Sequence, residues 1–470
     1  MENKRQPNIV LLMSDQHRYD CVGFSQKYPG KTPNIDRLAE KGVWFNNAYC
    51  TVPTCCPARQ SLISGQRPER FGAHWNYDIT LKVADLSPDN FSFAKSLKQS
   101  GYQTVYIGKW HVSSEHTPLE FGFDSYYGEG HYGEWFRAQG YKNPWSVVGE
   151  RGTKAMLGWK SDIPYEVAPP HFFARKAIEK IDELSADEEH PFLIVMSLSE
   201  PHLPCCPSEP FASIFTPKDV VKWGGFDDIF EDKPYIQKQM TRNWMLENLD
   251  WDDWSECVAR YYACIAQVDD AVGNVIRHLE ATGLASDTVI IYTADHGDMC
   301  GSHHMLDKHY IMYDDVVHIP LIVRWDGHFM PHVCDDFVHN FLDLHETMLA
   351  LGGAQSREVS DGESLLPQLE GVDLDRQYAV STYNGQQFGL YNQRMIRTEK
   401  YKYIWNLTDV DELYDMEKDP YELHNIVHEE EYADILKELR IQLYHALEKC
   451  EDRLLSSIGA KVQLLNGNKL

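Results

Sequence analysis

The feature that most constrains the fold is a set of short apolar runs, most of which lead into polar residues. Such runs, without polar alternation, are typical of strands buried on both faces of a parallel sheet. Helical patterns between them would cover both faces. The sequence therefore predicts an α/β fold with a large mixed, mostly parallel sheet sandwiched by helices. The expected strands are residues 8–13, 43–45, 104–107, 191–196, 288–293 and 318–323, and the expected helices are residues 32–41, 91–99, 171–184, 254–284 and 342–351.

The pattern changes after residues 362–367. The strands expected at residues 377–383, 388–397 and 401–406 are joined by turns without intervening helices, and an amphipathic helix follows at 432–450. This order indicates a small antiparallel sheet with a terminal helix. We therefore expect two units, residues 1–370 and a smaller α+β subdomain at residues 371–470.

Polar pairs follow two of the apolar runs. Asp15 and Gln16 come after residues 8–13, and Asp295 and His296 come after residues 288–293. Open α/β sheets place their sites at the carboxyl ends of the strands. Carboxylate, amide and imidazole groups are ligands for divalent cations, so the pairs predict one metal site. The alternative is that each aspartate caps a turn or a helix.

The stretch from Cys55 to Gly65 combines a thiol, Pro57 and Arg59 with helix formers. Pro57 suits the first turn of a helix, where its missing N–H is not needed. Cys55 then lies just ahead of that turn, where backbone N–H groups favour an anion. Arg59 is close enough in sequence to point at the same anion. The alternative is a loop cysteine before a capped helix.

Two further strand ends carry charged or imidazole side chains. Lys109 and His111 follow residues 104–107 and alternate on an extended backbone, so both can face one pocket. His202 lies between prolines after residues 191–196, and a histidine in a fixed loop suits proton delivery. The alternative for Lys109 and His111 is a solvated loop.

The net charge and the cysteine content bear on the binding partners and on the cellular compartment. A formal net charge of −27 argues against a nucleic-acid partner. The 11 cysteines include adjacent pairs that are poor material for disulfides, which indicates a reducing compartment. The sequence shows no signal-peptide layout and no apolar run of membrane-spanning length. We therefore expect a cytoplasmic protein without a membrane partner.

Two regions have no clear period. Residues 121–160 are dense in aromatic side chains, and residues 205–250 are irregular and charged. The aromatic region could stack on a sugar or aryl group beside a site. It could equally form a satellite core under a long loop. The charged region is expected to be a surface excursion.

Five segments together resemble the sulfatase family of the alkaline-phosphatase-like superfamily. They are Cys-x-Pro-x-Arg at residues 55–59, TPNIDRLAEKGVWFNNAY at 32–49, Gly-Lys-Trp-His at 108–111, the His-Pro segment around His202, and Ala-Asp-His-Gly-Asp at 294–298. The C-terminal region resembles the smaller subdomain of that family. The resemblance covers nearly the whole chain. It implies an alkaline-phosphatase-like fold and a sulfuric ester hydrolase.

The resemblance also implies a mechanism. Cys55 would be oxidised to formylglycine by a separate maturation enzyme. The hydrated form of formylglycine is a gem-diol. One of its hydroxyls, activated by a divalent metal, would attack the sulfur of the sulfate ester, and inorganic sulfate would later be released. His202 would protonate the departing alcohol, and His111 would help to expel sulfate. The metal ligands would be Asp15, Gln16, Cys55, Asp295 and His296, the charge on the sulfate would be held by Arg59, Lys109 and Lys308, and His303 would bind substrate.

Departures from the family pattern bear on the metal and the substrate. Many sulfatases have Asp-Asp and Asp-Asn where this chain has Asp15-Gln16 and Asp295-His296, a combination similar to choline sulfatase and the phosphonate monoester hydrolases. We expect Ca²⁺, with Mn²⁺ or Mg²⁺ as alternatives. The phosphonate hydrolases replace the lysine and histidine that stand here as Lys109 and His111.

The favoured substrate is therefore a sulfated carbohydrate or another small organic sulfate. One alternative is a phosphonate monoester or phosphodiester hydrolase on the same fold. The other is a non-catalytic binding protein in which Cys55 is never converted.

Overall fold

The computed structural model describes residues 6–77, 82–142, 152–385 and 389–469. Its main sheet has eight strands in the order β4-β3-β5-β1-β6-β7-β2-β8. All pairs within it are parallel except those of β7, which runs antiparallel to β6 and β2. The expected mixed, mostly parallel sheet is confirmed. The strands are β1 Asn8–Asp15, β2 Val43–Tyr49, β3 Gln103–Gly108, β4 Ser125–Tyr127, β5 Phe192–Pro201, β6 Thr288–Ala294, β7 Leu321–Arg324 and β8 His332–His339.

Helices cover both faces of this sheet because the central strands are buried on both sides. In β1, Ile9 and Leu11 pack into one hydrophobic cluster, while Val10 and Leu12 pack into the other. The first cluster includes residues of α2 Cys55–Ser64, α3 Phe93–Gln99 and α10 Asn340–Leu351. The second includes residues of α1 Pro33–Lys41, α6 Pro169–Ser185 and α8 Trp251–Ala281. Alternate side chains of one apolar run therefore anchor opposite helical layers.

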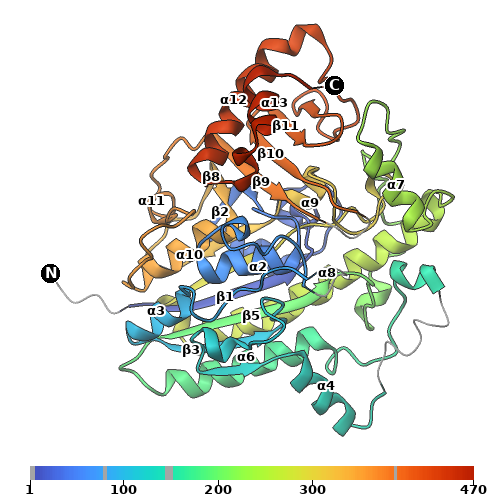
Figure 1. The fold of residues 1–470 in the computed structure, drawn as a ribbon. Coiled ribbons are helices and arrows are strands. Elements are labelled where there is room, and N and C mark those ends of the chain that lie inside the picture. Colours follow the sequence, from blue (N-terminus) through green and yellow to red (C-terminus); the bar gives the residue numbers. More distant parts are fainter. Residues whose placement is uncertain (1–5, 78–81, 143–151, 386–388, 470) are drawn as a thin grey trace.

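The C-terminal region forms a second sheet, antiparallel and four-stranded, in the order β12-β11-β10-β9. Its strands are β9 Tyr378–Tyr383, β10 Gln393–Thr398, β11 Tyr401–Asn406 and β12 Glu412–Asp415. They share a hydrophobic cluster with α12 Ala433–Lys449 and α13 Ile458–Asn466 (Figure 1, red). The expected antiparallel sheet and terminal helix are present, and the division at residue 370 stays a prediction.

Several elements were not expected from the sequence. The edge strand β8 is half exposed and mixes polar with apolar residues, so its run carries no buried-strand signal. Helix α4, Glu129–Ala138, lies in the aromatic region, and α7, Tyr235–Asn243, lies in the region expected to be irregular. Residues 143–151 of the aromatic region and residue 388 of an expected strand lie outside the described residues. The remaining short helices are α9 Asp314–Val317 and α11 Leu366–Leu369.

None of the helices within the described ranges combines the length and the apolar character needed to cross a membrane.

Candidate active site

The two predicted acid pairs meet because their strands are neighbours. β1 and β6 pair in parallel with Ser14 opposite Ala294. Asp15 ends β1 and Asp295 directly follows β6, so their side chains leave the same edge of the sheet side by side. Both side chains are fully buried. The sequence prediction that these strand ends form one site agrees with this geometry.

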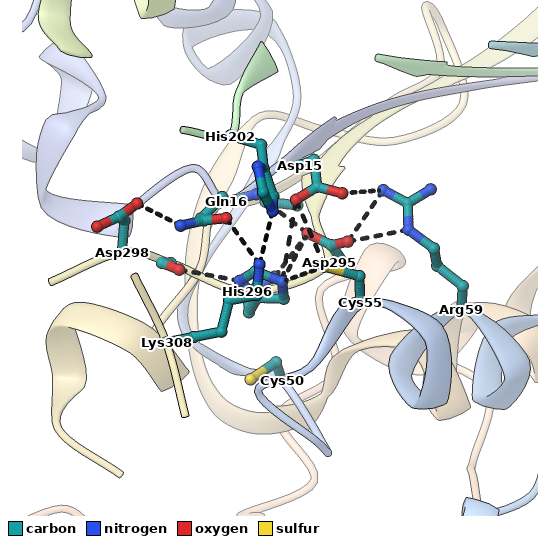
Figure 2. A network of polar contacts seen from close by, with 12 residues as sticks. Asp15, Gln16, Cys50, Cys55, Arg59, His202, Asp295, His296, Asp298 and Lys308 are labelled. Carbon is teal, nitrogen blue, oxygen red and sulfur yellow. Dashed lines mark hydrogen bonds and ion pairs between the residues drawn. The ribbon is translucent and has the colours of Figure 1, made fainter. Parts of the chain in front are cut away.

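Four possible ligand atoms gather at this edge. The ligand atoms of Asp15, Cys55, Asp295 and His296 all lie within 4.8 Å of one another (Figure 2). The Nε2 atom of His296 lies 3.2 Å from the Cys55 sulfur and 3.9 Å from Asp15 Oδ1. His296 Nδ1 lies 2.9 Å from the Gly297 carbonyl oxygen and donates to it, so Nε2 is the ring nitrogen that faces Cys55 and Asp15. Two carboxylates, an imidazole and a sulfur in this arrangement fit a divalent cation.

Gln16 lies beside this group in a left-handed backbone conformation, with φ of 70°. Its backbone N–H donates to Asp295 Oδ1 at 3.1 Å. Its amide nitrogen donates to Asp298 and to Asp307, and its Oε1 accepts a hydrogen bond from Lys308 Nζ at 3.0 Å. The amide is thus held with its oxygen toward Lys308, as Figure 2 shows. Its role as a metal ligand stays a prediction.

Cys55 is the first residue of α2, rather than a residue ahead of the helix as the sequence suggested. Pro57 lies in the first turn, as expected. Burial alone would raise the pKa of the Cys55 thiol, but Lys308, Lys109 and His296 hold it well below its ordinary value. A hydrogen bond with His111 lowers this pKa further. The position therefore favours a negative charge at the Cys55 side chain.

Arg59 takes a different position from the one expected. Its Nε and Nη2 contact Asp295 Oδ2 at 3.0 and 2.9 Å, and Nη2 also contacts Asp15 Oδ2 at 2.8 Å. Its Nη1 donates to Ser197 Oγ at 2.6 Å and to the Lys109 carbonyl oxygen at 3.1 Å. Arg59 makes four hydrogen bonds here, to Asp295, Asp15, Ser197 and the Lys109 carbonyl oxygen. Arg59 therefore positions the two aspartates, and its expected contact with a substrate anion stays a prediction.

Three further side chains, from other parts of the fold, lie on the side of the site where Cys55 lies: Lys109, Lys308 and His202. Lys109 Nζ lies 2.7 Å from Asp15 Oδ2. Lys308 Nζ lies 2.7 Å from His202 Nε2, and His202 Nδ1 donates to the Leu203 carbonyl oxygen at 2.7 Å. Burial lowers the pKa of Lys308, but Asp307 and Cys55 raise it above the ordinary value, so its ammonium donates to His202 Nε2. A lysine and a histidine are thus coupled by one shared hydrogen bond.

His303 does not join this group. Its Nδ1 pairs with Asp228 Oδ2 at 2.5 Å, and its ring stacks on Tyr313 with centroids 4.3 Å apart. A Cβ atom at Gly225 would lie 2.5 Å from His303 Nε2, so the Gly225 backbone covers the ring. Within the described ranges, the site residues above make no contact with His303. Asp228 holds the ring, and the expectation that His303 binds substrate stays a prediction.

The Asp228 pair predicts a pH dependence of stability. Burial raises the pKa of Asp228, but His303 and Lys233 lower it to about 2, below the ordinary 3.8. A depressed carboxyl pKa stabilises the fold above pH 4, and this contribution is lost as the pH falls toward 2. We expect Asp228→Asn to lower the free energy of unfolding at pH 7 by about 2 kcal/mol and to flatten its change between pH 4 and pH 2, measured by urea denaturation.

The matched control is the neighbouring Asp227→Asn. Asp227 pairs with Lys222 at the surface, where its side chain is 76% exposed. This change should alter the free energy of unfolding by less than about 0.5 kcal/mol. Equal effects of the two substitutions would contradict the role given to the buried pair.

Several residues of the site were not singled out from the sequence. Asp298 and Asp307 orient Gln16 and Lys308, and Ser197 accepts from Arg59. Asp298 lies two residues after His296, and Asp307 directly precedes Lys308, so proximity to predicted residues was a usable signal. Ser197 lies inside β5 and gives no such signal.

A cleft of about 590 Å³ opens beside Lys109 and His202. Its walls include Tyr132 and Phe136 of α4 and Trp159, whereas Phe121 and Phe123 belong to the main hydrophobic core. Part of the aromatic region is therefore main core and part lines a cleft at the site, and stacking on a sugar or aryl group stays a prediction.

The amino-acid sequence is similar to that of known proteins over most of its length. The sulfatase family model matches residues 7–354, and the model of the C-terminal region of N-sulphoglucosamine sulphohydrolase matches residues 301–449. An uncharacterized sulfatase, YidJ, of Escherichia coli strain K12 is 29% identical over 463 residues, covering 95% of this chain and 88% of that protein. A choline-sulfatase of Rhizobium meliloti strain 1021 is 27% identical, covering 89% of this chain and 82% of that protein.

Among solved structures, the phosphonate monoester hydrolase of Agrobacterium radiobacter superposes with a TM-score of 0.79. It is 23% identical, and the match covers 94% of this chain and 96% of that one. At this identity the likeness concerns the fold, which is the expected alkaline-phosphatase-like arrangement.

Proposed function

The chain belongs to the sulfatase family, and from this premise we propose that it hydrolyses a sulfate ester of a carbohydrate or another small organic molecule. The observation that supports the proposal best is the buried group of Asp15, Cys55, Asp295 and His296, with two lysines beside it. The preserved Lys109 and His111, which the phosphonate hydrolases replace, favour sulfate over phosphonate.

Membership of the family implies a metal ion and a formylglycine. Asp15, Gln16, Asp295 and His296, with the side chain at position 55, would hold the ion. The ion would supply electrophilic stabilisation of the reacting oxygens, and a hydrated formylglycine at position 55 would supply the attacking hydroxyl. A separate maturation enzyme would be needed to convert Cys55.

The remaining side chains would have separate tasks. Lys109 and Lys308 would stabilise negative charge on the sulfate, since both lower the pKa of the group at position 55. His202 shares a proton with Lys308 through its Nε2, so this pair would deliver a proton to the departing oxygen. His111 would accept a proton from the group at position 55. Arg59 would keep Asp15 and Asp295 in place.

A comparison of matched aryl esters tests the proposal. The matured protein is assayed on an aryl sulfate and on an aryl phosphonate monoester with the same leaving phenol. We expect the sulfate to be hydrolysed with the higher kcat/KM. A higher kcat/KM for the phosphonate would mean that the Asp15-Gln16 and Asp295-His296 pairs were the better guide, and that the chain is a phosphonate monoester or phosphodiester hydrolase.

Removal of divalent cations should abolish turnover and lower the melting temperature. Burial raises the pKa of Asp295 and so does Asp15, because the two carboxylates repel each other in a buried site. Binding of a cation whose free concentration is 100 times its Kd would stabilise the fold by about 2.7 kcal/mol. We expect Ca²⁺ to restore both rate and melting temperature after chelation, with Mn²⁺ and Mg²⁺ assayed alongside.

The matched control is Asp295→Asn, which removes one carboxylate of the group. Its melting temperature should respond less to Ca²⁺ than that of the unaltered chain. Full activity after chelation, with no metal found by elemental analysis, would contradict the metal site.

A further inference from the structure

The cleft beside Lys109 and His202 contains two polar atoms that are buried without a hydrogen-bond partner. They are the Oε2 atom of Glu200 and the hydroxyl of Tyr132, and both residues line the cleft. Buried polar atoms in folded proteins are nearly always hydrogen-bonded. In the ionised form a carboxylate oxygen can only accept, so the missing partner of that form is a hydrogen-bond donor. The pair therefore indicates a ligand that donates hydrogen bonds in this cleft.

A second carboxylate lines the same cleft. Glu129, the first residue of α4, accepts a hydrogen bond from Ser199 Oγ at 2.6 Å, and Ser199 directly precedes Glu200. Burial, and then Glu129, raise the pKa of Glu200 to about 7, so an approaching cation would stabilise its ionised form. The cleft thus holds the exposed Glu129 carboxylate and the buried, unpartnered Oε2 atom of Glu200, and the latter favours most strongly a ligand that brings positive charge.

The cations on the cleft walls do not satisfy Glu200. Lys109 pairs with Asp15 at 2.7 Å. Arg137 lines the cleft from the last turn of α4, but its side chain is exposed, so water screens its charge. The walls also present the aromatic side chains of Tyr132, Phe136 and Trp159. Aromatic faces attract ammonium groups, particularly where water is excluded.

We propose that the alcohol released from the sulfate ester carries a protonated amine, which binds between Glu200 and Glu129 against the aromatic wall of this cleft. The proposal rests on the proposed function, since it concerns the leaving group of that reaction. It narrows the substrate from any small organic sulfate to sulfate esters of amino alcohols, amino sugars or aminoalkyl phenols.

Three aryl sulfates that differ in one substituent test it. They are the 4-(aminomethyl)phenyl, 4-(hydroxymethyl)phenyl and 4-(carboxymethyl)phenyl sulfates, which carry a positive, neutral and negative group at neutral pH. We expect kcat/KM to be roughly 10- to 100-fold higher for the ammonium ester than for the hydroxymethyl ester. The carboxymethyl ester should be the poorest substrate.

Variants connect this preference to the cleft. Glu200→Gln and Glu129→Gln should each reduce the ratio of kcat/KM between the ammonium and hydroxymethyl esters, mainly through KM, while the hydroxymethyl ester changes by less than about threefold. Glu134→Gln is the matched control, because Glu134 is an exposed carboxylate of the same helix that does not line the cleft. It should leave the ratio unchanged.

Equal kcat/KM for the ammonium and hydroxymethyl esters, or a preference for the carboxymethyl ester, would overturn the proposal. An unchanged ratio of kcat/KM between the ammonium and hydroxymethyl esters in both Glu200→Gln and Glu129→Gln would overturn it as well. If none of the three esters releases sulfate, the proposed function fails, but binding still decides the inference. Calorimetry should then show 4-(aminomethyl)phenol binding more tightly than 4-(hydroxymethyl)phenol, and equal affinities would overturn the inference by themselves.

Discussion

Replacing Cys55 with alanine is expected to lower kcat/KM for sulfate release by at least about four orders of magnitude. The side chain at position 55 lies in the buried group that includes Asp15, Asp295 and His296, and two lysines favour negative charge on it. Alanine cannot be converted to an aldehyde, so it removes the attacking hydroxyl together with one possible metal ligand. The measurement is the steady-state rate of sulfate release from an aryl sulfate.

The adjacent Cys56 provides the matched control. Its sulfur lies 3.8 Å from the Val112 carbonyl oxygen, and its backbone N–H donates to Asn76. Because Cys56 is not part of the candidate metal group, Cys56→Ala should retain kcat/KM within about tenfold. Loss of activity in Cys56→Ala, with activity retained in Cys55→Ala, would show that the reactive residue is Cys56 and would contradict the assignment to Cys55.

Replacing Arg59 with alanine is expected to destabilise the metal-free protein by about 3–5 kcal/mol. Arg59 is 1% exposed and contacts both Asp15 and Asp295, which are themselves fully buried. Its removal leaves Asp295 without this ion pair and Asp15 with Lys109 alone, and the desolvation of an unpaired charge is unfavourable. The measurement is the free energy of unfolding from urea denaturation at pH 7 in the presence of a chelator.

Two further variants make this result specific. Arg37 pairs with Glu280 at the surface and is 40% exposed, so Arg37→Ala should change the free energy of unfolding by less than about 1 kcal/mol. Arg59→Lys keeps the charge but cannot reproduce the bidentate contacts, so its destabilisation should fall between the two alanine variants. If Arg59→Ala is no more destabilising than Arg37→Ala, the aspartates do not depend on Arg59.

The sequence predicted the sheet, and the closeness of the two acid pairs, because these signals are local. A run such as residues 8–13 must be buried whichever partners it finds, and the carboxyl ends of parallel strands necessarily share one edge. Asp15 and Asp295 could therefore be placed together although they lie far apart in the sequence. Lys109 and His202 were expected near this edge because they follow predicted strands, whereas Cys55 and Lys308 came from motifs that resemble the sulfatase family.

The parts that the sequence missed depend on tertiary partners. Arg59 was expected to face an anion on the substrate, but spacing along the chain could not show that Asp15, Asp295 and Ser197 would occupy its donors. His303 lies in a recognised segment, yet Asp228 from a distant loop holds its ring. Edge strand β8 mixes polar with apolar residues, and Phe136 is the one buried residue of α4, so neither element carries a clear apolar signal.

The most direct test of the central claim is the mass of the peptide that contains Cys55, measured in preparations matured to different extents and paired with their rates of sulfate release. We expect the rate to rise in proportion to the fraction of Cys55 converted to formylglycine. We also expect no turnover in protein that retains the thiol. A full rate with an unconverted thiol would contradict the account, and so would fully converted, metal-loaded protein that releases no sulfate from any of the aryl esters.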